Sequence, residues 1–324
     1  MMNMIENFYR AEFEKRGFSL NPDCSKYCRI GSCWSLSDQI GEGAFWIYSQ
    51  KDLFDIKIHD FFFYEDFLME FELPECLSIT HYESISGEEL APYRRLNAGC
   101  IKTFIGGGYP PYRALIHKNI PIRSIGIEIM PAYYEDYLKR QYPGENLRPR
   151  DAFSHVGQTM DFPEMVVLLN QVKNYRGDGI AAKLFYEGKV AESVSLIVER
   201  NKNSKPESRS SLHIQDIQRI ETVTAYLNDH YAYDIPLERL AKIACMGMTK
   251  LKTSFKQFHG CTVTEYIQQR RIGQAEHLLS DTDFSIGQIA QTVGYSSASR
   301  FAELFRKFTG LLPGEFRKMA KREA

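Results

Sequence analysis

Long apolar runs are missing from this chain of 324 residues. Neither sign of charge predominates, because the chain has 40 Lys and Arg and 41 Asp and Glu. Runs such as 165–169 extend over a few residues, whereas a bilayer-spanning helix needs about 18. The first residues, MMNMIENFYRAEFEKR, carry charges where an export signal would keep an apolar centre. We therefore expect no membrane span and no export signal, and we predict a cytoplasmic protein.

Cysteine is scarce, with seven residues of which five precede residue 101. An odd number spread over a long chain is typical of reduced thiols, so we expect no disulfides. Cys24, Cys28 and Cys33 are close in sequence, but a closed zinc site needs four well-placed ligands, and Cys76 and Cys100 are isolated. The histidines have no nucleophile or metal-spaced partner nearby. We therefore expect no metal, no cofactor and no enzymatic activity.

The composition is otherwise that of a folded globular protein, with 44% hydrophobic, 13% aromatic and 25% charged residues. The length predicts two or three domains. Charge is distributed unevenly: residues 212–324 contain 15 Lys and Arg against 12 Asp and Glu, and residues 1–211 contain 25 against 29. A basic C-terminal module beside an acidic N-terminal one is a mild indication of nucleic-acid binding.

A polar segment marks the expected boundary between the two modules. Residues 201–211, NKNSKPESRSS, contain no apolar side chain, which is typical of a linker. We predict an N-terminal domain over 1–200 and a C-terminal domain over 212–324. Short segments rich in aromatic or β-branched residues predict a mostly β N-terminal fold, a sandwich or small barrel; they lie near 44–50, 53–60, 66–72, 76–85, 100–105 and 121–130.

Helices are expected to follow these strands, near 164–172 and over 180–199. The second helix would either pair two protomers or pack on its own β domain, and the sequence leaves both open. Within the last strand, Ile125, Ile127 and Ile129 alternate with other residues, which predicts one buried face and one face that is polar or lines a cavity. The fold class is thus α+β, with trailing helices and an all-α C-terminal domain.

The C-terminal module contains an internal repeat. LAKIA at 240–244 is followed by FKQFHG at 255–260, and IAQTV at 289–293 is followed by FRKFTG at 305–310. Each unit reads as a short helix, a turn near Gly247 or Gly294, and a second helix that ends at Gly. We predict two helix-turn-helix units, over about 236–259 and 285–309. Recurring phenylalanines are expected in the core rather than stacked on bases: Phe255, Phe258, Phe301, Phe305, Phe308 and Phe316.

Capping boxes mark where two of these helices begin. Thr262 with Glu265 opens a helix over 263–279, and Ser285 with Gln288 opens the second unit. The helix between them would be about 26 Å long and act as a spacer. The second helix of each helix-turn-helix unit, here called the reading helix, is the one that would contact DNA bases. Two reading helices held by this spacer would enter successive major-groove segments about 34 Å apart.

These residues resemble the DNA-binding domain of the AraC/XylS family of transcription factors, over about residues 215–320. The resemblance is carried by Leu240-Ala241, Phe255-Lys256, Gly260, Tyr266, the segment 271–279, Ile286, Ile289-Ala290, Gly294-Tyr295, Phe301, Phe305-Arg306-Lys307, Gly310, Pro313 and Phe316-Arg317. The reading helices are most similar to the branch of pyochelin- and yersiniabactin-type siderophore regulators. The resemblance implies a sequence-specific regulator, an activator by family tendency, with an N-terminal effector-sensing and dimerising domain.

Transferred by position, the resemblance also implies which side chains meet DNA. In the first reading helix these are Met248, Thr249, Lys250, Lys252, Thr253 and Lys256, and in the second they are Ser297, Ala298, Ser299, Arg300, Ala302, Glu303, Arg306 and Lys307. Arg300 suits guanine and Glu303 suits cytosine, whereas Lys256, Arg306 and Lys307 suit phosphates. Gly247 and Leu312 stand where the family usually has a capping hydroxyl, so these helix starts are expected to be weaker.

The implied partners are double-stranded DNA, RNA polymerase, a second copy of the chain and a small effector, with a siderophore-like molecule suggested by the branch resemblance. DNA-bound molecules would lie in the bacterial nucleoid. Two alternatives remain open. One is an enzyme, such as an alkyl-transfer repair protein, that uses the reader for targeting. The other is a regulator whose N-terminal domain only oligomerises.

Overall fold

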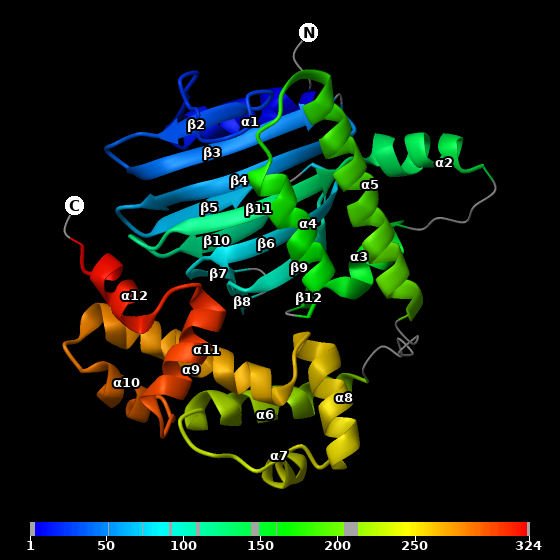
Figure 1. Cartoon of the computed structure of the whole chain (residues 1–324). Coiled ribbons are helices and arrows are strands. Elements are labelled where there is room, and N and C mark those ends of the chain that lie inside the picture. Colours follow the sequence, from blue (N-terminus) through cyan, green and yellow to red (C-terminus); the bar gives the residue numbers. More distant parts are fainter. Residues whose placement is uncertain are drawn as a thin grey trace. The chain divides into compact units, whose positions relative to one another are not determined.

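The computed structural model describes residues 4–50, 52–72, 74–90, 93–107, 111–143, 149–159, 161–203 and 213–322, and Figure 1 shows its elements. The chain divides into two units, Met1–Lys205 and Pro206–Glu323. The predicted linker lies outside the described residues from 204 onward. The first unit is mostly β and the second is helical, which confirms the predicted α+β class. No helix in the described ranges has the length and apolar content to cross a bilayer.

Two antiparallel sheets form the N-terminal unit. The large sheet has the strand order β1-β2-β3-β4-β11-β6-β9-β12, and the small sheet has the order β5-β10-β7-β8. The large sheet consists of β1 (Phe18–Leu20), β2 (Ser32–Leu36), β3 (Gly41–Gln50), β4 (Phe54–Phe63), β6 (Leu77–Ser84), β9 (Cys100–Ile105), β11 (Ile122–Ile129) and β12 (Gln158–Thr159). The small sheet consists of β5 (Phe67–Phe71), β7 (Gly87–Leu90), β8 (Tyr93–Arg95) and β10 (Tyr112–Ile116).

The six predicted strand segments correspond to β3, β4, β5, β6, β9 and β11. The remaining strands were not predicted, because they are short or carry charges within the strand, as Glu88 and Glu89 do in β7. The other elements are the helices α1 (Met4–Lys15), α2 (Leu138–Gln141), α3 (Pro149–Val156), α4 (Pro163–Asn174) and α5 (Gly179–Asn203), and a π-helix over Ala132–Tyr137.

One face of the large sheet is covered by α4 and α5, which cross it in Figure 1. Ile58 and Ile125 of the central strands are buried in one cluster with Leu169 of α4 and Tyr186 of α5. The long helix α5 therefore packs on its own domain, one of the two predicted arrangements. Its other side exposes Leu184, whose residue is 61% accessible. Pairing of protomers through this helix stays a prediction.

The opposite face of the large sheet packs against the small sheet and is also buried, although it is partly polar. Ser124 and Glu128 alternate with the isoleucines of β11 as predicted, yet both residues are buried. Lys57 of β4 forms an ion pair with Glu128, and His59 Nδ1 lies 2.6 Å from Ser124 Oγ. The polar side of this strand therefore lies inside the domain.

The C-terminal unit consists of seven helices in the described ranges. They are α6 (Ile214–His230), α7 (Leu237–Ile243), α8 (Met248–His259), α9 (Val263–Asp281), α10 (Ile286–Thr292), α11 (Ala298–Thr309) and α12 (Pro313–Ala320). Contacts join α6, α7 and α8 into one group and α10, α11 and α12 into another, and α9 contacts members of both groups. The repeat in the sequence thus forms two helical units that share one long helix.

Buried aromatic side chains form the core of each unit, as expected for five of the six phenylalanines. Phe255 is fully buried among Leu240, Leu251 and the apolar side of α6. The prediction was wrong for Phe258, which is 37% accessible. Helical spacing placed Phe258 near the core side, but the residue is exposed, and its ring meets the ring of His259 edge-on with a centroid distance of 4.9 Å.

Candidate nucleic-acid interface

The first predicted reading helix, α8, exposes one side over its whole length. Leu251 and Phe255 lie on its inner side and are fully buried. All six predicted contact residues of this helix are exposed: Met248, Thr249, Lys250, Lys252, Thr253 and Lys256. Residues three and four apart lie on the same side of a helix, so most of these side chains form one continuous surface.

The second predicted reading helix, α11, is arranged in the same way. Phe301 and Phe305 anchor its inner side and have no accessible surface. The predicted contact residues lie outside, and all are exposed except Ala302, which is half-buried: Ser297, Ala298, Ser299, Arg300, Ala302, Glu303, Arg306 and Lys307. Each unit thus offers one exposed helix face to solvent.

The two reading helices begin differently. Ser297 Oγ accepts a hydrogen bond from the Arg300 amide at 3.3 Å and caps α11. Gly247 precedes α8 and provides no side-chain cap, as expected. The turn lies directly before Gly247, as predicted, but Gly247 itself has a φ of −67° and does not adopt the left-handed conformation. Cys245 adopts that conformation instead, with φ 48°, at the position that Gly294 occupies with φ 91° in the second unit.

Cations without a carboxylate partner are found on both reading helices. Among the described residues, no carboxylate lies within ion-pair distance of Lys252 or Lys256 on α8, or of Arg306 or Lys307 on α11. Exposed, unpaired cations are the groups that replace condensed counterions on a phosphate backbone. Both faces therefore carry positive charge available for DNA.

Two other predicted contact residues are already engaged. Lys250 Nζ lies 2.9 Å from the carboxylate of Asp216, a residue of α6 that is 8% accessible. Arg300 Nη1 lies 3.2 Å from Glu303 Oε2, and both of these side chains are largely exposed. Exposed ion pairs contribute at most about 1 kcal/mol. Arg300 can therefore exchange Glu303 for a base edge at small cost, whereas Lys250 is held by a mostly buried partner.

Arg271, in the middle of α9, links the two helix-turn-helix groups of the C-terminal unit, α6–α8 and α10–α12. Its Nε donates to the carbonyl of Tyr231 at 2.7 Å, and its Nη2 donates to that of Tyr233 at 3.0 Å. Both acceptors follow α6 in the first unit. Its Nη1 donates at 2.8 Å to the carbonyl of Gly294, in the turn of the second unit. One side chain of the spacer helix α9 thus forms hydrogen bonds with both helix-turn-helix groups of the C-terminal unit.

The place where Arg271 meets both helix-turn-helix groups, which we call the junction, has little free space. Gly294 lies against the backbone of Ala232, so a Cβ at this position would approach the Ala232 carbonyl oxygen to 2.2 Å. The guanidinium of Arg271 also lies 5.2 Å from the ring centroid of Tyr295. Because α9 is 19 residues long, it extends about 28 Å. The junction and the spacer together determine how the reading helices are placed within the unit.

The sequence alone did not identify Arg271 or Asp216 as part of this arrangement. Arg271 belongs to the segment that carries the family resemblance, but its three acceptors are backbone carbonyls, which leave no trace in the amino-acid pattern. Asp216 is 34 residues away from Lys250 in the chain. A tertiary contact of this kind has no short-range signal.

The N-terminal cysteines are occupied by contacts within the domain. Cys28 Sγ donates to the carbonyl of Gly177 at 2.8 Å, and the Cys28 carbonyl accepts from Trp46 Nε1. Burial raises the pKa of Cys33 to about 12, which favours the thiol over the thiolate. In the described part of the chain, no three His, Cys, Asp or Glu residues are grouped to hold a metal ion.

Comparison with known proteins agrees with this geometry. Residues 240–319 match the family model described as a helix-turn-helix domain. The chain is 37% identical over 108 residues to the bifunctional transcriptional activator/DNA repair enzyme AdaA of Bacillus subtilis, covering 33% of this chain and 51% of the relative. It is 32% identical over 100 residues to the transcriptional activator RhaS of an Enterobacter species, covering 31% of this chain and 36% of the relative.

A third relative is the arabinose operon regulatory protein of Escherichia coli, 29% identical over 134 residues, which are 40% of this chain and 46% of that protein. The chain therefore spans about a third to a half of the length of these curated relatives. The matched segments, of 108, 100 and 134 residues, are comparable in length to the C-terminal unit.

Proposed function

We propose, from the premise that residues 240–319 form a helix-turn-helix domain of the AraC/XylS family, that this chain is a sequence-specific DNA-binding transcription regulator. The observation that carries the proposal is the pair of exposed helix faces, α8 and α11, each with unpaired cations and each fixed to the same spacer helix. Such a domain would read two adjacent major-groove segments on one face of the duplex.

The proposed contacts divide into base readout and phosphate binding. Arg300 would donate to guanine O6 and N7, and Glu303 would accept from cytosine N4. Thr249 and Thr253 would contact thymine methyl groups. The Thr253 hydroxyl supports this assignment because it donates to the Thr249 carbonyl at 3.1 Å, which leaves its methyl group for an apolar contact. Lys252 would join base readout. Phosphate contacts would come from Lys256, Arg306 and Lys307.

The sign of regulation and the role of the N-terminal domain are part of the same proposal. Two of the relatives are transcriptional activators by name, which supports activation through RNA polymerase at nearby promoters. A separate β unit preceding the DNA-binding unit supports a sensing and dimerising role, with a small effector that shifts the population of the binding-competent state. A siderophore-like effector and a location in the cytoplasm, at the nucleoid when DNA-bound, remain predictions.

The described part of the N-terminal domain provides no observation that favours the repair-enzyme alternative. AdaA is a bifunctional protein by name, but the match to it covers a third of this chain. Cys28 and Cys33 are buried, and their sulfur atoms lie in a hydrophobic cluster with Trp46. We therefore propose that the chain has no enzymatic activity. Zinc analysis of the purified protein tests this, because one bound zinc per chain would contradict it.

The experiment that tests the regulator proposal is genome-wide mapping of bound DNA, followed by titration of the recovered site at several salt concentrations. We expect a few sites upstream of one operon and a steep salt dependence. Arg300→Ala should lower discrimination against altered sites by about 1–3 kcal/mol while leaving affinity for scrambled DNA almost unchanged. Equal loss on both DNAs would contradict a base-reading role, and diffuse binding without preferred sites would contradict the proposal itself.

A further inference from the structure

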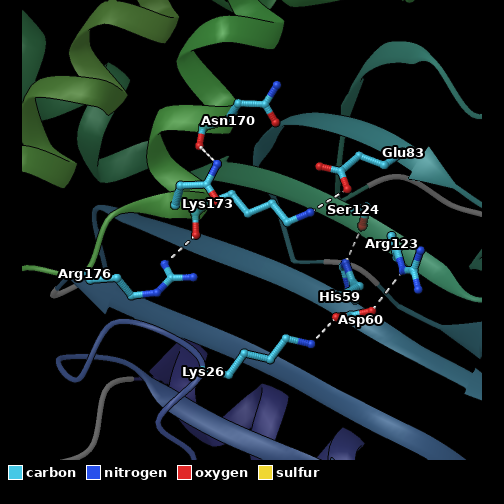
Figure 2. Close-up of polar contacts among 10 residues, drawn as sticks. Lys26, His59, Asp60, Glu83, Arg123, Ser124, Asn170, Lys173 and Arg176 are labelled. Carbon is cyan, nitrogen blue, oxygen red and sulfur yellow. Dashed lines mark hydrogen bonds and ion pairs between the residues drawn. The ribbon is translucent and has the colours of Figure 1, made fainter.

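Four cations gather at one end of the large sheet in the N-terminal domain, where α4 ends above β4, β11 and β6 (Figure 2). They are Lys26, Arg123, Lys173 and Arg176, and we call them the basic cluster. Each comes from a different segment: the loop before β2, strand β11, helix α4 and the loop after α4. Tertiary folding, rather than a run of basic residues, brings them together.

Two carboxylates partly balance these charges. Asp60 forms ion pairs with both Lys26 and Arg123, and Glu83 lies 2.5 Å from Lys173 Nζ. Arg176 Nη1 donates to the carbonyls of Lys173 and Tyr175, both at 2.8 Å. Within the described ranges, no carboxylate lies within ion-pair distance of Arg176. The four positive charges of the basic cluster are therefore accompanied by two negative charges, those of Asp60 and Glu83.

This excess runs against the composition of the domain. Residues 1–211 contain 25 Lys and Arg against 29 Asp and Glu, so positive charge is not the domain average. Like charges that are held near one another at a protein surface repel. An arrangement that keeps two cations on one carboxylate and leaves a third without any carboxylate is suited to a further anion.

Two buried polar atoms without hydrogen-bond partners lie beside the basic cluster. They are the hydroxyl of Tyr27 and Nδ1 of His81, and their residues are 5% and 8% accessible. Lys26 Nζ lies 5.5 Å from the ring centroid of Tyr27. Burial is the main cause of the raised pKa of Tyr27, which Asp60 also raises and Arg176 lowers. Burial likewise lowers the pKa of His81, which lies two residues before Glu83, the ion-pair partner of Lys173.

A buried donor or acceptor without a partner is costly, so native proteins usually satisfy such atoms with protein groups, water or a ligand. The neutral Tyr27 hydroxyl is a donor, and burial raises its pKa, so it stays protonated. An oxygen of an anionic ligand would accept from this hydroxyl while pairing with Arg176, whose planar fork suits phosphate and carboxylate oxygens.

We propose that the basic cluster is a binding site for a small dianionic molecule, a phosphate ester or a dicarboxylate, with Tyr27 and Arg176 as its main contacts. The binding step is independent of the function proposed above. The further statement that this dianion is the effector of the regulator rests on that function.

The test uses the full chain without DNA, titrated with inorganic phosphate in one arm and succinate in the other. Sodium chloride at matched ionic strength is the reference, and calorimetry measures binding. We expect saturable binding in at least one arm, which also tells the phosphate class from the dicarboxylate class. Arg176→Gln should weaken it about tenfold, as expected for loss of a charge-assisted hydrogen bond. Arg140→Gln removes the same charge from exposed α2 and should leave affinity unchanged.

A second variant controls for misfolding, because Arg176 also holds the backbone after α4. Tyr27→Phe removes a hydroxyl that has no partner in the described structure, so it should leave the unfolding temperature unchanged without anion and weaken anion binding about tenfold. Binding in neither arm, equal weakening by Arg140→Gln, or unaltered affinity in both site variants would overturn the proposal. A parallel titration with operator DNA tests the regulator function separately, so the two can fail independently.

Discussion

Replacing Arg271 should separate the stability of the DNA-binding unit from the chemistry of its reading faces. Arg271→Ala removes three charge-assisted hydrogen bonds, to the carbonyls of Tyr231, Tyr233 and Gly294 at 2.7, 3.0 and 2.8 Å. Hydrogen bonds from charged groups contribute about 1.5–3 kcal/mol each, but bonds made by one side chain are not additive. We therefore expect a loss of about 3–5 kcal/mol in the free energy of opening around the junction.

The assay is hydrogen–deuterium exchange of the full chain, read from peptides that cover α6 to α11. Exchange reports local opening free energies, so it resolves the junction without requiring the two units to unfold together. Protection should fall most at the α6–α7 loop and at the turn before α11. The control is Arg270→Ala, the neighbouring residue, whose guanidinium lies 5.9 Å from the ring centroid of Tyr231 and makes none of these three bonds.

The DNA readout follows from the same geometry. A rigid pair of readers gains affinity on a two-segment site because the second contact is effectively intramolecular. Arg271→Ala should therefore weaken binding to the full site at least about tenfold, while binding to half-sites changes little. Equal protection in Arg271→Ala and Arg270→Ala, together with unchanged full-site affinity, would refute the conclusion that Arg271 sets the position of the two units.

Three further changes test other parts of the structure. Lys307→Ala should reduce the slope of log affinity against log salt by about one, and an unchanged slope would remove Lys307 from the phosphate contacts. Gly294→Ala should cost about 2 kcal/mol or more in chemical denaturation, because φ is 91° and the Cβ would meet Ala232; Gly314→Ala, in open space, is the control. Burial raises the pKa of Asp55 to about 7, so its contribution to stability is complete below about pH 4 and is lost as pH rises through 7. Asp55→Asn should remove this dependence and make the protein more stable than the wild type at pH 8; a pH profile identical to that of the wild type would contradict this.

The DNA-binding unit was largely predictable because its signals are local. Capping boxes at Thr262 and Ser285 form as the sequence predicts, with both return hydrogen bonds present. The terminal glycines Gly260 and Gly310 adopt the left-handed conformation that ends α8 and α11. These features depend on residues within one helical turn of each other, so the amino-acid pattern contains the information.

Other features depend on residues that are distant in the chain. In the turn of the first helix-turn-helix unit, Cys245 rather than Gly247 takes the positive φ, a conformation that the sequence does not predict for a cysteine. The polar side of β11 is buried because the small sheet covers it, and strand alternation does not say what lies on the second face. The basic cluster likewise depends on how α4 crosses the large sheet.

By itself the sequence determined the α+β fold class, the repeat of two helix-turn-helix units and the residues that face outward on each reading helix. These follow from helical periodicity and capping, which operate over three to four residues. Tertiary structure alone decided that Arg271 joins the two units, that Asp216 holds Lys250, and that Lys26, Arg123, Lys173 and Arg176 meet at one end of a sheet. Such contacts join residues that are tens to more than a hundred positions apart, so only the folded chain brings them within reach of one another.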